Sequence, residues 1–120
     1  MPDEYVIVLS TLPADADPAR LAATLVEERL AACVNVTAAM TSVYRWADGV
    51  EQETEHQLVM KTTRERLPAL WERLRDLHPY DVPEFVAIPI VDGNDAYLKW
   101  IGDSTRVTRG AAEREKAEPS

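Results

Sequence analysis

Two periods of hydrophobicity alternate along the chain, one typical of strands and one typical of helices. Residues 5–9, YVIVL, form a continuous apolar run, which predicts a buried central strand. A polar loop is expected over residues 10–17. Asp17 before Pro18 then provides an N-cap and a first helical residue, so a helix should extend to about residue 32. Its apolar stripe consists of Leu21, Leu25, Val26 and Leu30.

The middle of the chain has a period of two, which predicts a β-hairpin. Apolar residues mark one face of a first strand over residues 33–46, namely Val34, Val36, Ala38, Met40, Tyr44 and Trp46. Asp48 and Gly49 are expected to supply the positive φ angle of a tight turn after Ala47. The return strand should run from residue 50 to about residue 62. One of its faces carries Glu51, Glu53 and Glu55, and the other carries Val50, Leu58 and Met60.

The last third of the chain predicts a second helix, a strand and a short helix. Thr63 can cap the second helix, whose apolar stripe consists of Leu67, Leu70, Trp71, Leu74 and Leu77. His78 and Pro79 end it, because the residue before a proline is pushed out of the helical region. A strand is expected over residues 84–91, at an edge or a bulge because a proline lies within it. Asn94 can cap a final helix that carries Tyr97, Leu98, Trp100 and Ile101.

The predicted order is strand, helix, strand, strand, helix, strand and a small helix. This order indicates an α+β fold, a ferredoxin-like split βαβ sandwich with a long β-hairpin, in which the strands are arranged in the order 4-1-3-2. At 120 residues the chain can bury a sufficient core as one domain, expected over residues 1–106. Residues 107–120 show no periodicity and are expected to be disordered or loosely held.

The predicted hairpin is longer than the rest of the domain requires. Strands of about 13 residues span roughly 43 Å, whereas a helix of ~13 residues covers only about 20 Å. The surplus part carries Tyr44, Trp46 and unpaired backbone groups, which another chain would have to cover. We therefore expect a homo-oligomer in which each hairpin extends a neighbour's sheet and the contacts close into a ring.

Charge and composition exclude several classes of partner. The chain has 13 Lys and Arg against 21 Asp and Glu, a net charge of -8 that disfavours the phosphate backbone of nucleic acids. No apolar run approaches the ~20 residues of a membrane span. The start, MPDEYVIVLS, lacks the basic and apolar regions of a signal peptide, and the single cysteine fits a reducing compartment. A cytoplasmic location is therefore expected.

Residues 77–85, LHPYDVPEF, allow two interpretations. In the structural one, His78 ends a helix and Glu84 begins a strand. In the functional one, the imidazole of His78 and a carboxylate of Asp81 or Glu84 bind a borderline cation such as Cu(II) or Zn(II). Two ligands are too few for a closed tetrahedral site, so the others would have to come from another element or another subunit.

Cys33 also has two interpretations. It is either a small buried hydrophobe or a thiolate ligand for Cu(I) or Hg(II). The predicted strand order places it far from His78 within one subunit, so a site that joins the two would have to cross a subunit interface. The sequence has no Gly-rich phosphate loop, HExxH, CxxC or serine elbow, so an enzyme is not expected.

Three aromatic residues could line a cleft between subunits: Tyr44, Trp46 and Tyr80. Lys61, near the inner end of the return strand, could meet a carboxylate or an anionic ligand there. Packing for the aromatic residues and surface pairing for the lysine are the simpler interpretations.

Several motifs together closely resemble the CutA divalent-cation tolerance family. They are ERLAACVNV, SVYRWADGVEQETE, LVMKTT, LHPYDVPE and YLKWI, and the resemblance extends in order from residue 5 to about residue 105. It implies a cytoplasmic, very stable homotrimer of ferredoxin-like subunits, similar in architecture to the PII signalling proteins. It also implies binding of copper and other divalent ions and a link to metal tolerance. Cys33 matches the cysteine of the AACVN motif, and His78, Tyr80 and Glu84 match the HPY-x-x-PE motif.

Two functions follow from this resemblance. The first is divalent-cation binding, copper foremost because of the Irving–Williams order, with no obligatory cofactor. Its expected metal ligands are His78, Glu84, Cys33 and Asp81. The alternative is a PII-like signalling trimer that binds a small organic ligand in clefts between subunits and passes its state to an unidentified protein partner. The expected cleft residues are Tyr44, Trp46, Lys61 and Tyr80.

Overall fold

The structure is a computed structural model and describes residues 5–107. The predicted disorder of residues 107–120 therefore lies outside the described residues, apart from Val107. The strands are β1 (Tyr5–Pro13), β2 (Cys33–Val36), β3 (Met40–Trp46), β4 (Gly49–Thr63) and β5 (Val86–Pro89). The helices are α1 (Pro18–Glu27), α2 (Leu67–Leu77) and α3 (Asp95–Thr105), and a short 3-10 turn, η1 (Arg64–Arg66), precedes α2.

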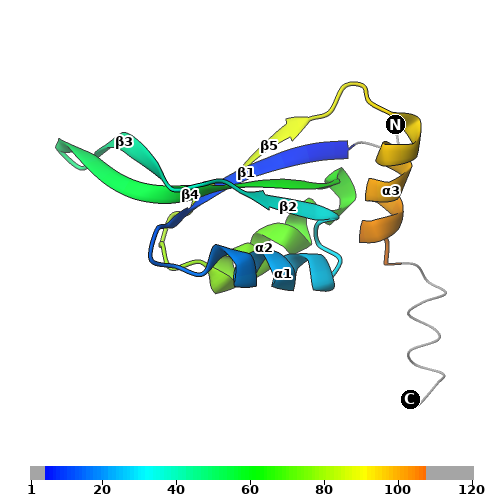
Figure 1. The fold of residues 1–120 in the computed structure, drawn as a ribbon, viewed down its shortest axis with the longest axis horizontal. Coiled ribbons are helices and arrows are strands. Elements are labelled where there is room, and N and C mark those ends of the chain that lie inside the picture. Colours follow the sequence, from blue (N-terminus) through cyan, green and yellow to red (C-terminus); the bar gives the residue numbers. More distant parts are fainter. Residues whose placement is uncertain (1–4, 108–120) are drawn as a thin grey trace, which may run out of the picture.

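All strand pairs are antiparallel and form one sheet in the order β2-β4-β1-β5, with β3 paired to β4 beyond the end of β2. When β2 and β3 are counted as one interrupted strand, this is the order 4-1-3-2 that the sequence predicts. Helices α1 and α2 lie against one face of the sheet, and α3 stands at the end opposite the hairpin (Figure 1). The result is a layered α+β fold.

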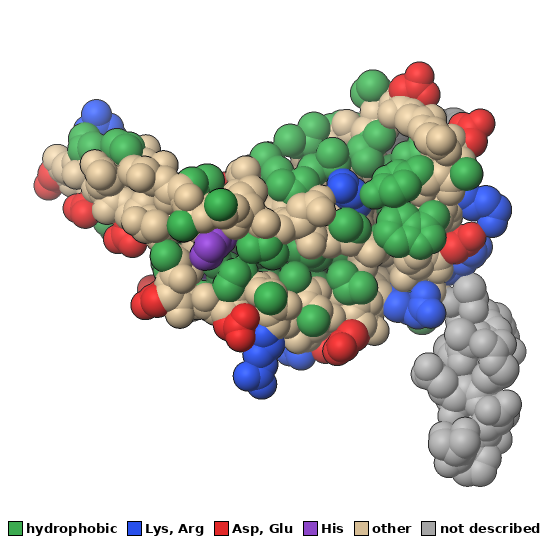
Figure 2. Space-filling model, viewed as in Figure 1, with side chains coloured by type: hydrophobic (Ala, Val, Ile, Leu, Met, Phe, Trp, Pro, Cys, Tyr) green, Lys and Arg blue, Asp and Glu red, His purple; other side chains and the backbone are tan. Residues whose placement is uncertain are grey.

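The main core lies between the sheet and helices α1 and α2. Alternate residues of β1 and β4 point toward the helices and are at most 1% exposed: Val6, Val8, Leu58 and Met60. The helices contribute Leu21, Leu25, Leu70 and Leu74. Burial of each such side chain stabilises the fold by roughly 1.5–3 kcal/mol. On the opposite face of the sheet, Val86 and Ile88 of β5 are partly exposed. Figure 2 shows further hydrophobic side chains at the surface along the body of the molecule.

The first strand and the first helix have different limits from those predicted. Residues 10–13, expected in a polar loop, continue β1 because β4 is long enough to pair with them as far as Pro13 and Glu55. The N-cap is confirmed, since the Asp17 Oδ1 atom accepts a hydrogen bond from the Arg20 backbone N–H at 3.1 Å. Helix α1 ends at Glu27 rather than near residue 32, because Arg29 adopts a positive φ of 61°. The chain then turns into the core.

The strand predicted over residues 33–46 is interrupted by a one-residue bulge. Val36 faces Leu58 and Met40 faces Glu55, so three residues on one strand lie opposite two on the other. The Thr37 side chain accepts a hydrogen bond from the Gln57 backbone N–H at 2.8 Å and satisfies this part of the ladder. The prediction that the even-numbered apolar residues share one face is therefore wrong. Val36 lies on the helix side of the sheet, and Met40 lies on the opposite side.

The hairpin turn also differs from the prediction. Strand pairing closes at Trp46 and Gly49, so the loop consists of Ala47 and Asp48. Among the described residues no glycine has a positive φ, and Ala47 takes this conformation with φ of 53°. The prediction that Asp48 and Gly49 supply the positive φ is wrong, because Gly49 is already the first residue of β4.

The second half of the chain follows the prediction with two corrections. Thr63 makes no side-chain capping bond, because η1 separates it from α2. Helix α2 ends at Leu77 as expected, and the Asn94 side chain caps α3 by accepting from the Tyr97 backbone N–H at 3.1 Å. Strand β5 is shorter than residues 84–91, since Phe85 packs against the ring of Trp71 at 5.0 Å instead of joining the sheet. Its place at the edge of the sheet is confirmed.

The predicted overhang of the hairpin is confirmed. Strand β1 pairs with β4 only from Glu55 onward, and the Thr54 carbonyl accepts from the Ala14 backbone N–H, so among the described strands residues 49–53 of β4 pair only with β3. This two-stranded part projects away from the helices (Figure 1). It exposes three large apolar side chains by 59–66%: Val43, Trp46 and Val50.

Candidate functional site

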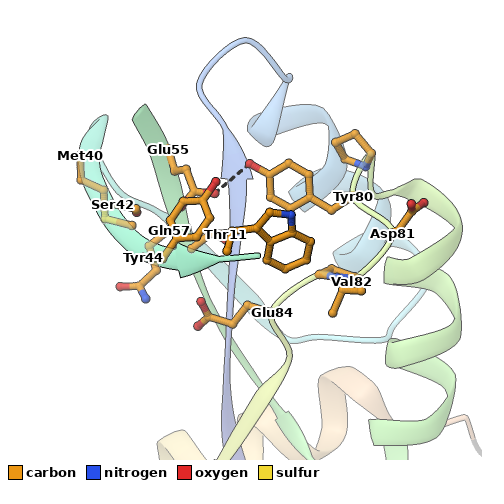
Figure 3. Close-up of a pocket in the computed structure, with 13 residues that line it drawn as sticks. Thr11, Met40, Ser42, Tyr44, Glu55, Gln57, Tyr80, Asp81, Val82 and Glu84 are labelled. Carbon is orange, nitrogen blue, oxygen red and sulfur yellow. Dashed lines mark hydrogen bonds between the residues drawn. The ribbon is translucent and has the colours of Figure 1, made fainter. Parts of the chain in front are cut away.

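A cavity of about 700 Å³ lies where the hairpin leaves the body of the sheet. Its walls come from β3 and β4, from Thr11 of β1 and from residues 79–84, the loop that follows α2 (Figure 3). Its polar and aromatic lining includes Tyr44, Trp46, Glu55, Gln57, Tyr80, Asp81 and Glu84. We refer to it as the hairpin cavity.

The bulge at residues 37–39 positions the hairpin side of this cavity. By shifting the register by one residue, it turns Met40, Ser42 and Tyr44 onto the same face as Glu55 and Gln57. Without the shift, these three side chains would lie on the helix side of the sheet. The predicted alternation thus identified the right residues but the wrong face.

His78 positions the loop side of the cavity. Its Nδ1 atom accepts a hydrogen bond from the Tyr80 backbone N–H at 3.1 Å, because that N–H can only donate. Its Nε2–H therefore donates to the Thr11 carbonyl oxygen at 2.6 Å. The side chain is 7% exposed and its ring packs against Tyr80. Thr11 lies beyond the β1–β5 pairing, which ends at Leu9, so its carbonyl is available for this bond.

These contacts bear on the predicted metal site. Both ring nitrogens of His78 are occupied within the subunit, so a metal could reach either one only by displacing a protein hydrogen bond. In this conformation the residue fits the structural interpretation of LHPYDVPEF. The described residues contain no group of three or more His, Cys, Asp and Glu side chains that could hold a metal ion.

Glu55 and Tyr80 form the buried centre of the cavity. The Tyr80 hydroxyl donates to Glu55 Oε2 at 2.8 Å, and Glu55 is only 6% exposed (Figure 3). Burial, followed by the hydrogen bond and the charge of Glu55, raises the pKa of Tyr80 well above its usual range, so the phenol remains a donor at neutral pH. Glu55 does not share the exposure of Glu51 and Glu53 on the same strand face, since Tyr80 of the loop after α2 contacts its carboxylate.

Three other groups that can lose a proton line the cavity: Glu84, Tyr44 and Asp81. Burial and the nearby charge of Glu55 raise the pKa of Glu84. Desolvation and the charges of Glu53, Glu51 and Glu55 raise the pKa of Tyr44. Asp81 is exposed and lies on the side of the cavity away from Glu55 (Figure 3). The electrostatic potential in the cavity is therefore negative.

The two remaining predicted site residues lie elsewhere. Cys33 is half-buried at the start of β2 and faces Lys61 across the strand pair. Lys61 donates to Asn35 Oδ1 at 2.8 Å and does not line the hairpin cavity. Along β4, Lys61 is four residues from Gln57, the neighbour of Thr11, which corresponds to about 13 Å. The register agrees with the expectation that Cys33 and His78 are far apart within one subunit.

Several lining residues were not predicted from the sequence. Met40 reaches the cavity because of the bulge, and Thr11 reaches it because β1 extends to pair with Gln57 and beyond. The signal that could have identified the bulge is the run of residues 37–39, Thr-Ala-Ala, which has no large apolar side chain to hold a register.

Comparison with known proteins agrees with the resemblance seen in the motifs. The family described as CutA1 divalent ion tolerance protein matches residues 6–104. A relative from Thermus thermophilus, named divalent-cation tolerance protein CutA, is 48% identical over 99 residues, which are 82% of this chain and 96% of the relative. Another from Xenopus laevis, named protein CutA homolog, is 46% identical over 93 residues, and the match spans 78% of this chain but only 62% of the longer relative.

A solved structure leads to the same conclusion. The divalent cation tolerance protein (Cut A1) of Thermus thermophilus superimposes with a TM-score of 0.82 at 47% identity, covering 85% of this chain and 99% of that one. On sequence and fold together, the chain belongs to the CutA family.

Proposed function

We propose that this chain contributes to tolerance of divalent cations as a cytoplasmic, non-enzymatic homotrimer of ferredoxin-like subunits that binds copper most tightly. The names of its relatives support the link to divalent-cation tolerance. The observation that carries cation binding is the hairpin cavity, whose lining includes Glu55, Glu84 and Asp81 but no Lys, Arg or His. In the described part of the chain no helix is long and apolar enough to cross a membrane.

The exposed hairpin supports the trimer. Its overhang leaves Val43, Trp46 and Val50 in contact with solvent together with an unpaired backbone edge, a combination that favours pairing with another chain. On the sheet face opposite α1 and α2, Val86 and Ile88 are also 48% and 43% exposed. A ring of three subunits in which each hairpin covers a neighbour would bury both surfaces.

We propose that carboxylates bind the metal and that no single subunit provides the complete site. Glu84 and Asp81 line the hairpin cavity, and residues of a neighbouring subunit would complete the coordination. Cys33 could contribute a thiolate at a separate position. His78 could take part only after releasing Thr11 or Tyr80. Copper is proposed first because Cu(II) is the tightest-binding divalent ion at most nitrogen and oxygen sites.

The test combines mass and affinity. Light scattering should give three times the 13.5 kDa of one chain. A calorimetric Cu(II) titration at pH 7 against a weak chelator should show submicromolar binding that Glu84→Gln or Asp81→Asn weakens at least tenfold. Glu72→Gln, which removes an exposed charge of α2, is the matched control and should leave binding unchanged. A monomer, or copper affinity that is equal in all variants, would contradict the proposal.

Cys33→Ser and His78→Ala locate the remaining ligands. Loss of copper binding in Cys33→Ser alone would move the site to β2, away from the hairpin cavity. Loss of copper binding in His78→Ala has to be compared with the melting temperature of this variant, because removal of one buried and one partly buried hydrogen bond also destabilises the loop.

A further inference from the structure

A second cavity, of about 360 Å³, lies beside α3 at the end of the molecule opposite the hairpin. Its walls come from α3 and the residues that follow it, from η1, and from the adjoining ends of β1 and β4. Figure 2 shows Lys and Arg side chains grouped beside α3 at this end. We refer to it as the α3 cavity. It shares no lining residue with the hairpin cavity.

The α3 cavity carries a surplus of positive charge in a chain that is negative overall. Three basic side chains line it, Arg66, Lys99 and Arg106, against two acidic ones, Glu65 and Asp103, so its charge is +1 where the whole chain has -8. Lys99 and Arg106 both pair with Asp103, so two cations share one carboxylate. The hydrogen bond from Lys99 contributes most to lowering the pKa of Asp103, against the opposing effect of burial. The local charge therefore favours an anion.

Arg66 provides donors that have no partner within the subunit. Its Nε–H donates to the Arg29 carbonyl oxygen at 3.3 Å, a bond that restrains the guanidinium group. Its two terminal nitrogens, Nη1 and Nη2, make no hydrogen bond to a described residue, and no described carboxylate forms an ion pair with it. A guanidinium group binds a phosphate or a carboxylate through two parallel N–H bonds. Arg66 is therefore held in place at the cavity without an anionic partner.

Compensation of the helix end does not account for this charge. Arg29 already performs that role, since its Nη1 atom donates to the carbonyl oxygens of Asp103 at 3.5 Å and Ser104 at 3.2 Å, at the C-terminal end of α3. Arg66 bonds to the backbone of Arg29 and not to α3. Thr63, on the same wall, makes no side-chain capping bond, so its hydroxyl adds a neutral donor.

We propose that the α3 cavity binds a phosphate group, either as the free ion or as part of a small ester. The guanidinium of Arg66 donates to two of its oxygens, and Lys99 and Arg106 supply the remaining positive charge. Phosphate fits better than a carboxylate, because donors from three side chains and a hydroxyl exceed what two carboxylate oxygens accept. The volume of about 360 Å³ lies near the lower end of the range for small-molecule sites. This inference goes beyond divalent-cation tolerance and does not depend on copper binding.

The test uses inorganic phosphate and glycerol 3-phosphate as probes on the intact protein in its native oligomeric state. Binding is followed at pH 7 by calorimetry and by the backbone amide NMR signal of Gly102, which lines the cavity. The salt concentration is fixed, because salt screens surface charges. At least one of the two probes should bind with a dissociation constant below about 1 mM and shift the Gly102 signal. Glycerol, the matched neutral probe, should do neither, and the tighter of the two phosphates identifies the source of the group.

The variants separate the cavity from general surface charge. Arg66→Gln should weaken phosphate binding at least tenfold. Arg20→Gln makes the same change of charge at an exposed position of α1 outside the cavity and should leave binding unchanged. Glu65→Gln removes an exposed acidic residue of the lining and should tighten binding at least twofold, so it tests the site even if Arg66→Gln unfolds. Thermal melting of each variant checks that it folds.

Three results would overturn the inference. The first is that neither phosphate probe binds or shifts the Gly102 signal. The second is equal weakening by Arg66→Gln and Arg20→Gln, which would show attraction to surface charge in general. The third is phosphate binding that Glu65→Gln weakens. The Cu(II) titration is read independently, because none of the proposed metal ligands lines the α3 cavity.

Discussion

Removal of one hydroxyl group should test the buried centre of the hairpin cavity. Tyr80→Phe deletes the donor to Glu55 Oε2, a hydrogen bond of 2.8 Å to a carboxylate that is 6% exposed. Hydrogen bonds to charged groups contribute about 1.5–3 kcal/mol, so we expect the free energy of unfolding to fall by about 2 kcal/mol. The remaining ring should keep its packing against His78.

The assay is urea unfolding at one fixed protein concentration, because the stability of an oligomer depends on concentration. Tyr97→Phe is the matched control. Tyr97 is 43% exposed, and its hydroxyl has no hydrogen bond to a described residue, so its loss should change stability by less than about 0.5 kcal/mol.

A double-mutant cycle with Glu55→Leu separates the pair from other effects of each substitution. The coupling energy between the two positions should be about 1.5–3 kcal/mol, since each single variant already breaks the same bond. If Tyr80→Phe is as stable as the Tyr97→Phe control, or the coupling is below about 0.5 kcal/mol, Glu55 and Tyr80 do not form the bond described here.

Three further outcomes follow from the structure. Ala47→Gly should raise the free energy of unfolding by up to about 1 kcal/mol, because glycine accepts the positive φ at this turn without the strain of a Cβ atom, and a lowered urea midpoint would contradict this. Glu84→Gln should stabilise the protein by up to about 1 kcal/mol at pH 7. Folding raises the pKa of Glu84, so the wild type loses stability as pH rises from the unfolded pKa through the folded one; the difference between the two proteins should vanish at pH 3, and a constant difference would refute this cause. Val50→Asp should lower the mass measured by light scattering, since Val50 is 66% exposed on the hairpin overhang and the variant places a charge there. An unchanged mass would show that Val50 does not lie in the interface.

The sequence predicts the order of elements well because the periodic segments are long and their caps are local. Asp17 and Asn94 each bond to a backbone N–H three residues later, so their role can be read from a few neighbouring positions. His78 ends α2 for an equally local reason, the proline that follows it. The strand order also follows from the order of elements, because few connections between them are sterically favourable.

The limits of β1 depended on a partner far away in sequence. Residues 10–13 look like a loop when read alone, and they become a strand because β4 extends to pair with them. Glu55 is the corresponding case for a side chain. It looks like part of an exposed acidic ladder, but its side chain is only 6% exposed and its carboxylate is contacted by Tyr80, which lies 25 residues away in sequence. Local patterns could predict neither result.

The bulge at residues 37–39 explains why a cavity forms beside Glu55. A regular strand from residue 33 to residue 46 would place Met40, Ser42 and Tyr44 on the helix side, where Val34 packs against the core. One extra residue reverses this and places an aromatic wall beside Glu55. The same step leaves the far half of the hairpin with an apolar side, at Val43 and Val50, that no part of the described chain covers. The interface proposed between subunits and the cavity proposed for a cation therefore share one local cause, the insertion at residues 37–39. A change in that insertion should affect both properties together.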